Sequence, residues 1–183
     1  MVAKIFAKYA KREFRMIQPK QEKEIFTEGK IRDVVVYPLK KFADDRGWLA
    51  ELFRHDEIAE EFYPAMAYIS VTDPGIARGP HEHVEQADLF CFIGTGNFKF
   101  RMWDNREDSP TFRNVMTLFV GENNPTAVIV PKGIVHAYKN ESETEKGVVI
   151  NCPNRLYMGE GKREPIDEIR HEDDPDTIFR MEN

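Results

Sequence analysis

Two histidines separated by one residue are the clearest candidates for chemistry in this chain. His81 and His83 end the run Gly-Ile-Ala-Arg-Gly-Pro-His-Glu-His, and Asp88 follows shortly after it. Side chains two residues apart on an extended chain face the same way. Two buried imidazoles need a partner, which a divalent metal ion or a substrate anion can supply. The cluster therefore predicts a metal or anion site, with a solvent-facing strand end as the simpler alternative.

A second polar cluster occupies residues 131–140, which read Pro-Lys-Gly-Ile-Val-His-Ala-Tyr-Lys-Asn. After the Pro-x-Gly turn, strand alternation places His136, Tyr138 and Asn140 on one face and Val135 and Ala137 on the other. A histidine, a tyrosine and an amide that project together from an apolar strand predict a polar pocket inside the fold. A lone core histidine is the competing explanation, and the first cluster weighs against it.

Short strands must position both clusters. Between residues 31 and 153, β-branched and aromatic runs recur with Gly, Pro, Asp and Asn between them, for example at 34–39, 47–53, 65–72, 89–93 and 98–103. The run 89–93 is apolar on both faces, which is typical of a strand buried on both sides. Gly94-Thr95-Gly96 after it predicts a hairpin. Because helical periodicity is confined to 56–62 and the N-terminus, we predict an all-β sandwich or barrel, such as a jelly roll, with short peripheral helices.

Composition limits the class of protein. The chain has 183 residues, 41% of them hydrophobic, which suits one globular domain. Its net charge of −6 argues against general nucleic-acid binding. No apolar run reaches the ~20 residues that cross a bilayer, and no signal peptide is recognisable, so we expect a cytoplasmic protein that does not bind a membrane. Cys91 and Cys152 are isolated, which excludes a disulfide scaffold and a Cys-x-x-Cys metal site.

Charge divides the chain into three parts. Residues 1–30 carry eight Lys or Arg against four Glu, and we expect an N-terminal extension there that includes a solvated amphipathic helix. Residues 31–158 form the predicted barrel. Residues 159–183 are strongly acidic, with nine Asp or Glu against four Lys or Arg, and we expect an acidic C-terminal tail on the surface.

The two polar clusters resemble the paired motifs of the cupin superfamily, whose members are small jelly-roll β-barrels. The first motif is Gly, five residues, His-x-His and an acid a few residues later. The second is Pro-x-Gly-x-x-His-x-x-x-Asn. Gly75, His81, His83 and Asp88 fit the first motif, with Asp where Glu is commoner. The second motif is matched at every position, by Pro131, Gly133, His136 and Asn140. The resemblance implies a cupin barrel with these side chains in its interior.

Within that superfamily, residues 31–175 resemble the dTDP-4-dehydrorhamnose 3,5-epimerase family. The resemblance rests on Asp45-Arg46-Gly47 with Glu51 and Arg54, on Arg78-Gly79-x-His81, on the run from Asp104 to Phe112, and on Tyr157. It implies an isomerase of carbohydrate biosynthesis that epimerises a nucleoside-diphosphate 4-keto-6-deoxy sugar without a metal. In that family a histidine removes the proton next to the ketone and a tyrosine returns one on the other face.

The resemblance also implies roles for individual residues. His81 becomes the base, with His83 and His136 beside it as catalytic pocket residues, and Tyr138 is our candidate acid. The nucleotide-sugar would be bound by Arg46, Glu51, Arg78, Asn151 and Tyr157. The family is typically dimeric, and residues such as Arg46 and Glu51 serve the nucleotide of the neighbouring subunit. We therefore expect a homodimer formed through the N-terminal strands.

Three alternatives stay open on the sequence alone. The His-x-His after Arg-Gly also resembles the 3,4-ketoisomerases of the same sugar nucleotides, which move the carbonyl by paired proton transfers. His81, His83, Asp88 and His136 would suit Fe, Mn, Ni or Zn in a metal-dependent cupin enzyme. Asp88 and Asn151 stand where the family has a lysine and its acid tyrosine, which favours a non-catalytic sugar-binding cupin. Metal content distinguishes the metal-dependent enzyme from the other candidates. Exchange of substrate protons with solvent distinguishes an epimerase from a non-catalytic sugar-binding protein.

Overall fold

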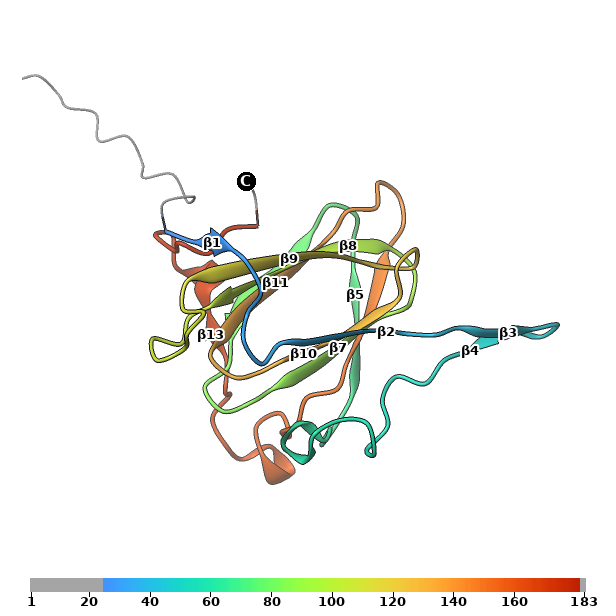
Figure 1. Ribbon diagram of the computed structural model, residues 1–183, viewed down its shortest axis with the longest axis horizontal. Helices are drawn as coiled ribbons and strands as arrows, with labels where there is room; N and C mark the ends of the chain where they lie inside the picture. Colours follow the sequence, from blue (N-terminus) through green and yellow to red (C-terminus); the bar gives the residue numbers. More distant parts are fainter. Residues whose placement is uncertain (1–24, 182–183) are drawn as a thin grey trace, which may run out of the picture.

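The computed structural model describes residues 25–181, and they form a jelly-roll β-barrel of two facing sheets (Figure 1). This confirms the predicted all-β cupin fold. The expected N-terminal helix falls largely in residues 1–24, which lie outside the described part. One sheet has the strand order β1-β9-β8-β11-β6-β13 and the other β2-β10-β7-β12-β5. A separate hairpin, β3-β4, projects from the barrel as an arm.

The strands are short and follow the expected runs closely. The six-stranded sheet contains β1 (Thr27–Glu28), β6 (Ala77–Glu82), β8 (Asn97–Asp104), β9 (Asn114–Gly121), β11 (Ile134–Asn140) and β13 (Ile169–Arg170). The five-stranded sheet contains β2 (Val35–Pro38), β5 (Tyr68–Thr72), β7 (Asp88–Phe92), β10 (Thr126–Val130) and β12 (Gly147–Asn151). The arm is β3 (Phe42–Asp44) and β4 (Gly47–Leu49), and the helices are the 3-10 turns η2 (Glu60–Phe62), η3 (Glu160–Lys162) and η4 (His171–Asp173).

Strand alternation sorts side chains between the barrel interior and the outer layer. On β7, Phe90 and Phe92 join the interior core, whereas Leu89 and Cys91 pack outward against the segment 50–62. This explains why the run 89–93 is apolar on both faces. On β11, Tyr138 joins the interior core and His136 is buried beside it, while Val135 and Ala137 face an outer cluster.

The prediction of a hairpin at Gly94-Thr95-Gly96 is wrong. β7 pairs with β10 and β12, whereas β8 pairs with β9 and β11, so the three residues carry the chain from one sheet to the other. The glycines are needed because the backbone passes close to the start of β12: a Cβ on Gly96 would lie 2.6 Å from the Cα of Gly147. Gly96 also has a φ of +87°, which favours glycine.

The described part of the acidic C-terminal segment, residues 159–181, is mostly exposed and is attached along the barrel surface. Its strand β13 pairs with β6, with Arg170 opposite His81. Farther on, Phe179 is buried against Phe26 and Trp103, with ring centroids 5.6 and 5.8 Å apart. A strand edge and one aromatic anchor therefore hold the acidic segment across the barrel, and its carboxylates reach the interior site.

Two smaller expectations also change. The predicted strand 47–53 ends at Leu49, and residues 50–53 run on as an irregular segment that covers β7. The helical periodicity at 56–62 yields only the 3-10 turn η2. Among residues 25–181, no helix has the length and apolar character needed to cross a membrane.

Candidate active site

A cavity of about 1290 Å³ opens at one end of the barrel. Strands β5 and β7 of one sheet and β6 and β11 of the other supply its inner walls, and the segment 153–170 forms its rim. His81, His83, Asp88, His136 and Tyr138 all line it. The two polar clusters of the sequence therefore meet in one cavity, large enough for an extended small molecule.

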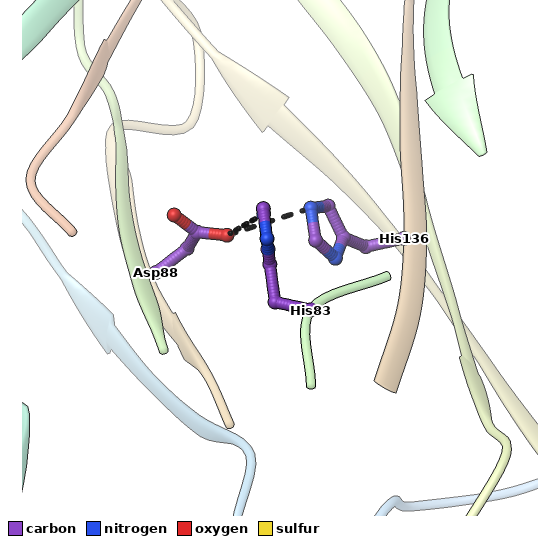
Figure 2. Close-up of side chains that lie close together, drawn as sticks. All are labelled: His83, Asp88 and His136. Carbon is purple, nitrogen blue, oxygen red and sulfur yellow. Dashed lines mark ion pairs between the residues drawn. The ribbon is translucent and has the colours of Figure 1, made fainter. Parts of the chain in front are cut away.

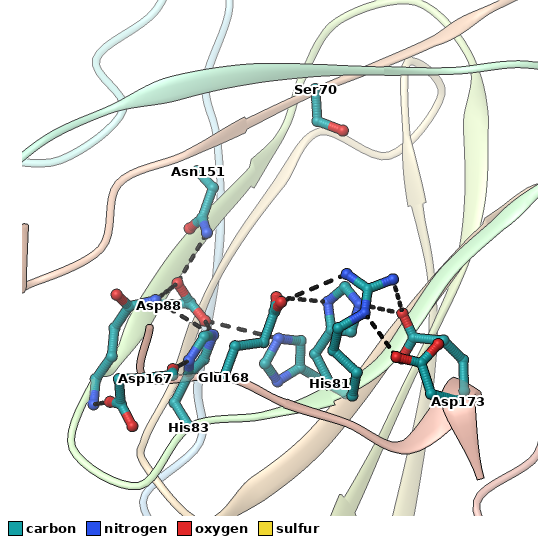
Figure 3. A network of polar contacts seen from close by, with 12 residues as sticks. Ser70, His81, His83, Asp88, Asn151, Asp167, Glu168 and Asp173 are labelled. Carbon is teal, nitrogen blue, oxygen red and sulfur yellow. Dashed lines mark hydrogen bonds and ion pairs between the residues drawn. The ribbon is translucent and has the colours of Figure 1, made fainter. Parts of the chain in front are cut away.

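His81 is held by two carboxylates of the C-terminal segment (Figure 3). Its Nε2 lies 2.7 Å from Oε1 of Glu172, and its Nδ1 lies 3.3 Å from Oε1 of Glu168. Glu168 lines the cavity, whereas Glu172 does not. The pairing of β13 with β6 brings both carboxylates to His81. Such carboxylates fix the orientation of the ring and stabilise it once it takes up a proton.

His83 turns away from His81 because β6 ends at Glu82. Its Nδ1 contacts the backbone carbonyl of Asp167, and its Nε2 lies 3.2 Å from Oδ2 of Asp88. Nε2 of His136 approaches the same oxygen at 3.6 Å (Figure 2). The ligand atoms of His83, Asp88 and His136 lie within 4.8 Å of one another. The expected four-residue set is therefore reduced to three, because His81 is engaged elsewhere.

The two histidines beside Asp88 have opposite pKa shifts. Burial lowers the pKa of His83, but the hydrogen bond and the charge of Asp88 outweigh it and raise the value to about 9. Burial lowers the pKa of His136 to about 4, and the more distant Asp88 charge only partly offsets it. Burial raises the pKa of Asp88, yet His83 and His136 bring it below its usual value. In the absence of a ligand, His83 and Asp88 thus form an ion pair next to a neutral His136.

Other predicted site residues fall into three groups. Arg78 and Tyr157 line the cavity; Arg78 donates to Thr72 Oγ1 at 2.9 Å and is thereby held against β5. Asn151 is buried behind Asp88 and donates to its Oδ1 at 2.8 Å, so it supports the wall instead of lining the cavity. Arg46 and Glu51 do not join the site of their own chain.

Arg46 lies in the exposed turn of the arm, where it binds Asp44, and Glu51 follows the arm. Neither residue lines the cavity. In the expectation above, these residues serve a neighbouring subunit, and their place on a projecting arm is compatible with that role. The run from Asp104 to Phe112 also lies away from the cavity. Its buried Asp104 accepts hydrogen bonds from Arg106, Ser109 and Thr111 and so fixes a loop.

Sequence reasoning missed several residues of the site. Tyr68 lines the cavity from β5, and its alternation with Ser70 and Thr72 in the run AYISVT was the available signal. Glu168 and Glu172 gave no local signal, because only their long-range contact with His81 distinguishes them from other acidic residues. Asp167 was also missed: its carboxylate accepts from the backbone N–H groups of 84–86 at 2.8–3.0 Å and fixes the loop after His83.

Comparison with known proteins agrees with this geometry. The family model described as dTDP-4-dehydrorhamnose 3,5-epimerase matches residues 28–169. The probable low-salt glycan biosynthesis epimerase Agl13 of Haloferax volcanii is 39% identical over 128 residues, which cover 69% of this chain and 81% of that protein. The spore coat polysaccharide biosynthesis protein SpsL of Bacillus subtilis is 37% identical over 119 residues, 65% of this chain and 78% of that protein.

Solved structures share the fold at lower identity. A dTDP sugar isomerase from Desulfovibrio desulfuricans has a TM-score of 0.66 at 18% identity, covering 76% of this chain and 84% of that one. A dTDP-4-dehydrorhamnose 3,5-epimerase from Bacillus anthracis, with TDP and PPi bound, has a TM-score of 0.62 at 22% identity, with coverage of 72% and 78%. The family match spans most of the described residues and both cavity motifs. The chain therefore belongs to the dTDP-4-dehydrorhamnose 3,5-epimerase family, a family of isomerase-type enzymes of sugar biosynthesis.

Proposed function

We propose that this protein epimerises a dTDP-linked 4-keto-6-deoxy sugar, with His81 as the base that removes the proton next to the ketone. The observation that carries the proposal is the position of His81 on the cavity wall between Glu168 and Glu172. A carbonyl acidifies the neighbouring C–H bonds, and an imidazole held in place by carboxylates is suited to accept such a proton. Agl13 is named an epimerase, and the Bacillus anthracis structure contains TDP, which supports the substrate class.

In this proposal, the two ring nitrogens of His81 have separate tasks. The hydrogen bond from Nε2 to Glu172 fixes the ring, and Nδ1 is the nitrogen on the side of the cavity-lining Glu168. The proton from the sugar would pass to Nδ1, where Glu168 stabilises the imidazolium. Arg78 supplies a fixed positive charge inside the cavity, which suits the diphosphate or the enolate oxygen.

Incubation with a dTDP-4-keto-6-deoxyhexose tests the proposal. We expect inversion at a carbon next to the ketone, detected by NMR of the product. Movement of the carbonyl to the neighbouring carbon would instead identify a ketoisomerase. Binding of the sugar nucleotide without any reaction would identify the non-catalytic sugar-binding alternative.

A homodimer is part of the proposal. The arm exposes Phe42, Trp48 and Leu49, which are 45%, 52% and 61% accessible in the single chain. Three large apolar side chains on a projecting hairpin favour burial against another surface. A second copy of the chain would cover them and would receive Arg46 and Glu51 at its own cavity.

Replacing Trp48 and Leu49 by serine is expected to convert the dimer into a monomer, because the apolar contact area of the arm is lost. Light scattering at micromolar concentration measures the change. Asp45→Ser, a polar change in the exposed turn of the same arm, is the control that should stay dimeric. A wild-type protein that is monomeric at that concentration would contradict the dimer.

A metal-dependent cupin enzyme is a second candidate, favoured by the group His83, Asp88 and His136. Nδ1 of His136 is 3.1 Å from the carbonyl of Ile134, and Nδ1 of His83 contacts the carbonyl of Asp167. Both Nε2 atoms are thereby presented to the Asp88 carboxylate. Metal-binding histidines are held in this way by a hydrogen bond through the other ring nitrogen. Two imidazoles and one carboxylate would suit Fe, Mn, Ni or Zn.

Metal content tests this second candidate. If the group binds an ion, protein incubated with Zn²⁺, Mn²⁺, Ni²⁺ or Fe²⁺ and then desalted should retain about one equivalent per chain. His136→Ala should lose the ion and the thermal stabilisation that it confers, because binding to the folded state is lost. His81→Asn is the matched control, since His81 is outside the group. Desalted wild-type protein without any of these ions would contradict a metal site.

The remaining expectations stay predictions. They are a cytoplasmic location and the absence of nucleic-acid and membrane partners. A nucleotide-sugar as small-molecule partner follows from the function proposed above.

A further inference from the structure

The proposed base lies on one wall of the cavity, and inversion of a carbon needs a proton donor at its other face. His81 projects from β6 in the six-stranded sheet. Asn151, where the family resemblance would place a tyrosine, has no acidic proton. Tyr68, Tyr138 and Tyr157 line the cavity among the described residues. Their contacts differ enough to choose between them.

We propose that Tyr68 is the acid that returns the proton, an inference that rests on the proposed epimerase function. Tyr68 projects from β5 in the opposite sheet and is directly paired with Asn151 of β12. Nδ2 of Asn151 donates a hydrogen bond to the Tyr68 hydroxyl oxygen at 2.9 Å. Because this oxygen is the acceptor, its own proton remains available for the cavity.

Asn151 is itself fixed for this task. Its Nδ2 also donates to Oδ1 of Asp88, at 2.8 Å, and the residue is buried. An amide held in place next to a phenol oxygen stabilises the phenolate that remains when the proton leaves. Asn151 therefore acts as a positioning residue for Tyr68, and the missing tyrosine on β12 is replaced by one on the neighbouring strand.

Tyr138 and Tyr157 suit the task less well. Tyr138 is only 6% accessible, and its ring packs against those of three phenylalanines, Phe90, Phe92 and Phe98. Its hydroxyl shares a 2.8 Å hydrogen bond with Ser70. Tyr157 lies on the irregular rim after β12. Tyr68, by contrast, is 45% accessible and belongs to an inner wall.

Electrostatics agrees with a protonated Tyr68 close to the base. Burial is the largest cause that raises its pKa, to about 12, and the hydrogen bond from Asn151 opposes the shift. The charge of Glu168 contributes to the increase, and the same carboxylate lies 3.3 Å from Nδ1 of His81. Glu168 therefore contacts His81 and contributes to the electrostatic environment of Tyr68, while the two side chains project from different sheets.

The transfer balances in two steps. His81 takes the proton from the carbon beside the ketone, and the electron pair of that C–H bond forms the C=C bond of an enolate. The enolate carbon then takes the Tyr68 hydroxyl proton on its opposite face while the carbonyl re-forms. The turnover leaves His81 protonated and Tyr68 as a phenolate, and proton exchange with water in the open cavity restores both.

Tyr68→Phe separates proton removal from inversion. In D₂O with a dTDP-4-keto-6-deoxyhexose, we expect inversion to slow by about 10²–10⁴-fold. Deuterium should still enter the carbon beside the ketone with retained configuration, because His81 returns a deuteron on its own face. Tyr63→Phe, the matched control at a tyrosine that does not line the cavity, should invert the sugar at close to the wild-type rate. Binding of dTDP and thermal unfolding check that each variant is folded.

Two results would overturn the inference while leaving the proposed function intact. One is inversion by Tyr68→Phe at the wild-type rate. The other is a loss of deuterium uptake that matches the loss of inversion, which would mean that Tyr68 assists binding or the base. A wild-type protein that neither inverts the sugar nor exchanges its proton would overturn the proposed function itself.

Discussion

His81→Asn is expected to abolish proton exchange next to the ketone while the fold and dTDP binding are kept. Asparagine has nearly the shape of the imidazole ring but cannot accept a proton at neutral pH, and loss of a general base typically slows a reaction by about 10²–10⁴-fold. Deuterium uptake from D₂O, followed by NMR, measures this step. Unlike Tyr68→Phe, this variant should lose exchange and inversion together.

His55→Asn provides the control for His81→Asn. His55 is exposed and stacks on Tyr63, with ring centroids 4.2 Å apart, and it does not line the cavity. Its replacement should leave deuterium uptake unchanged. Uptake by His81→Asn at the wild-type rate would remove His81 from the mechanism.

Replacing Glu168 and Glu172 together by glutamine is expected to lower kcat by about 10²-fold with little change in KM. The amides keep the size of the side chains but remove the charges that orient and stabilise a protonated His81. Loss of the carboxylate charge from another histidine–carboxylate pair lowers kcat by about 10⁴-fold, so the decrease of about 10²-fold expected here is the smaller effect. Steady-state kinetics with the keto sugar measures the effect.

The design of this double variant includes two checks. Asp176→Asn changes an exposed acid of the same segment that does not contact His81, and it should behave as wild type. Retention of dTDP binding would show that the rim of the cavity is intact. A double variant with wild-type kcat would mean that the two carboxylates serve only the attachment of the C-terminal segment.

Much of the inner site was predictable because it depends on strand parity. His136 and Tyr138 face the barrel interior since they alternate with Val135 and Ala137, and no long-range information is needed for that. The meeting of the two clusters also followed from their motifs. The register confirms it, with His81 directly opposite His136 on neighbouring strands.

Long-range pairing explains what was missed. Nothing near Glu172 in the sequence indicates that β13 adds to β6, because the segment is short and strongly charged. The parity argument for His81 and His83 also fails partly, since the strand ends between them and each ring finds a different carboxylate. Glycines at a sheet crossover are the same residues that a hairpin uses, so Gly94 and Gly96 did not distinguish the two.

Tyr68 takes the place of the tyrosine that the family has at position 151, and this replacement is visible only in the three-dimensional structure. The sequence shows an asparagine at position 151 and suggests that an acid is missing. The pairing of β5 with β12 places a phenol directly beside that asparagine. An acid group that is missing from β12 can therefore be supplied by the neighbouring strand β5. A sequence motif does not show this, because the two residues are far apart in the chain.

The central claim is tested most directly by the wild-type protein and a dTDP-4-keto-6-deoxyhexose in D₂O. NMR follows two signals: the proton on each carbon beside the ketone, and the configuration of the product. We predict that deuterium replaces at least one of these protons and that the same carbon is inverted. Recovery of the sugar with all its protons and its original configuration, although the protein binds dTDP, would contradict the assignment of this cavity as an epimerase active site.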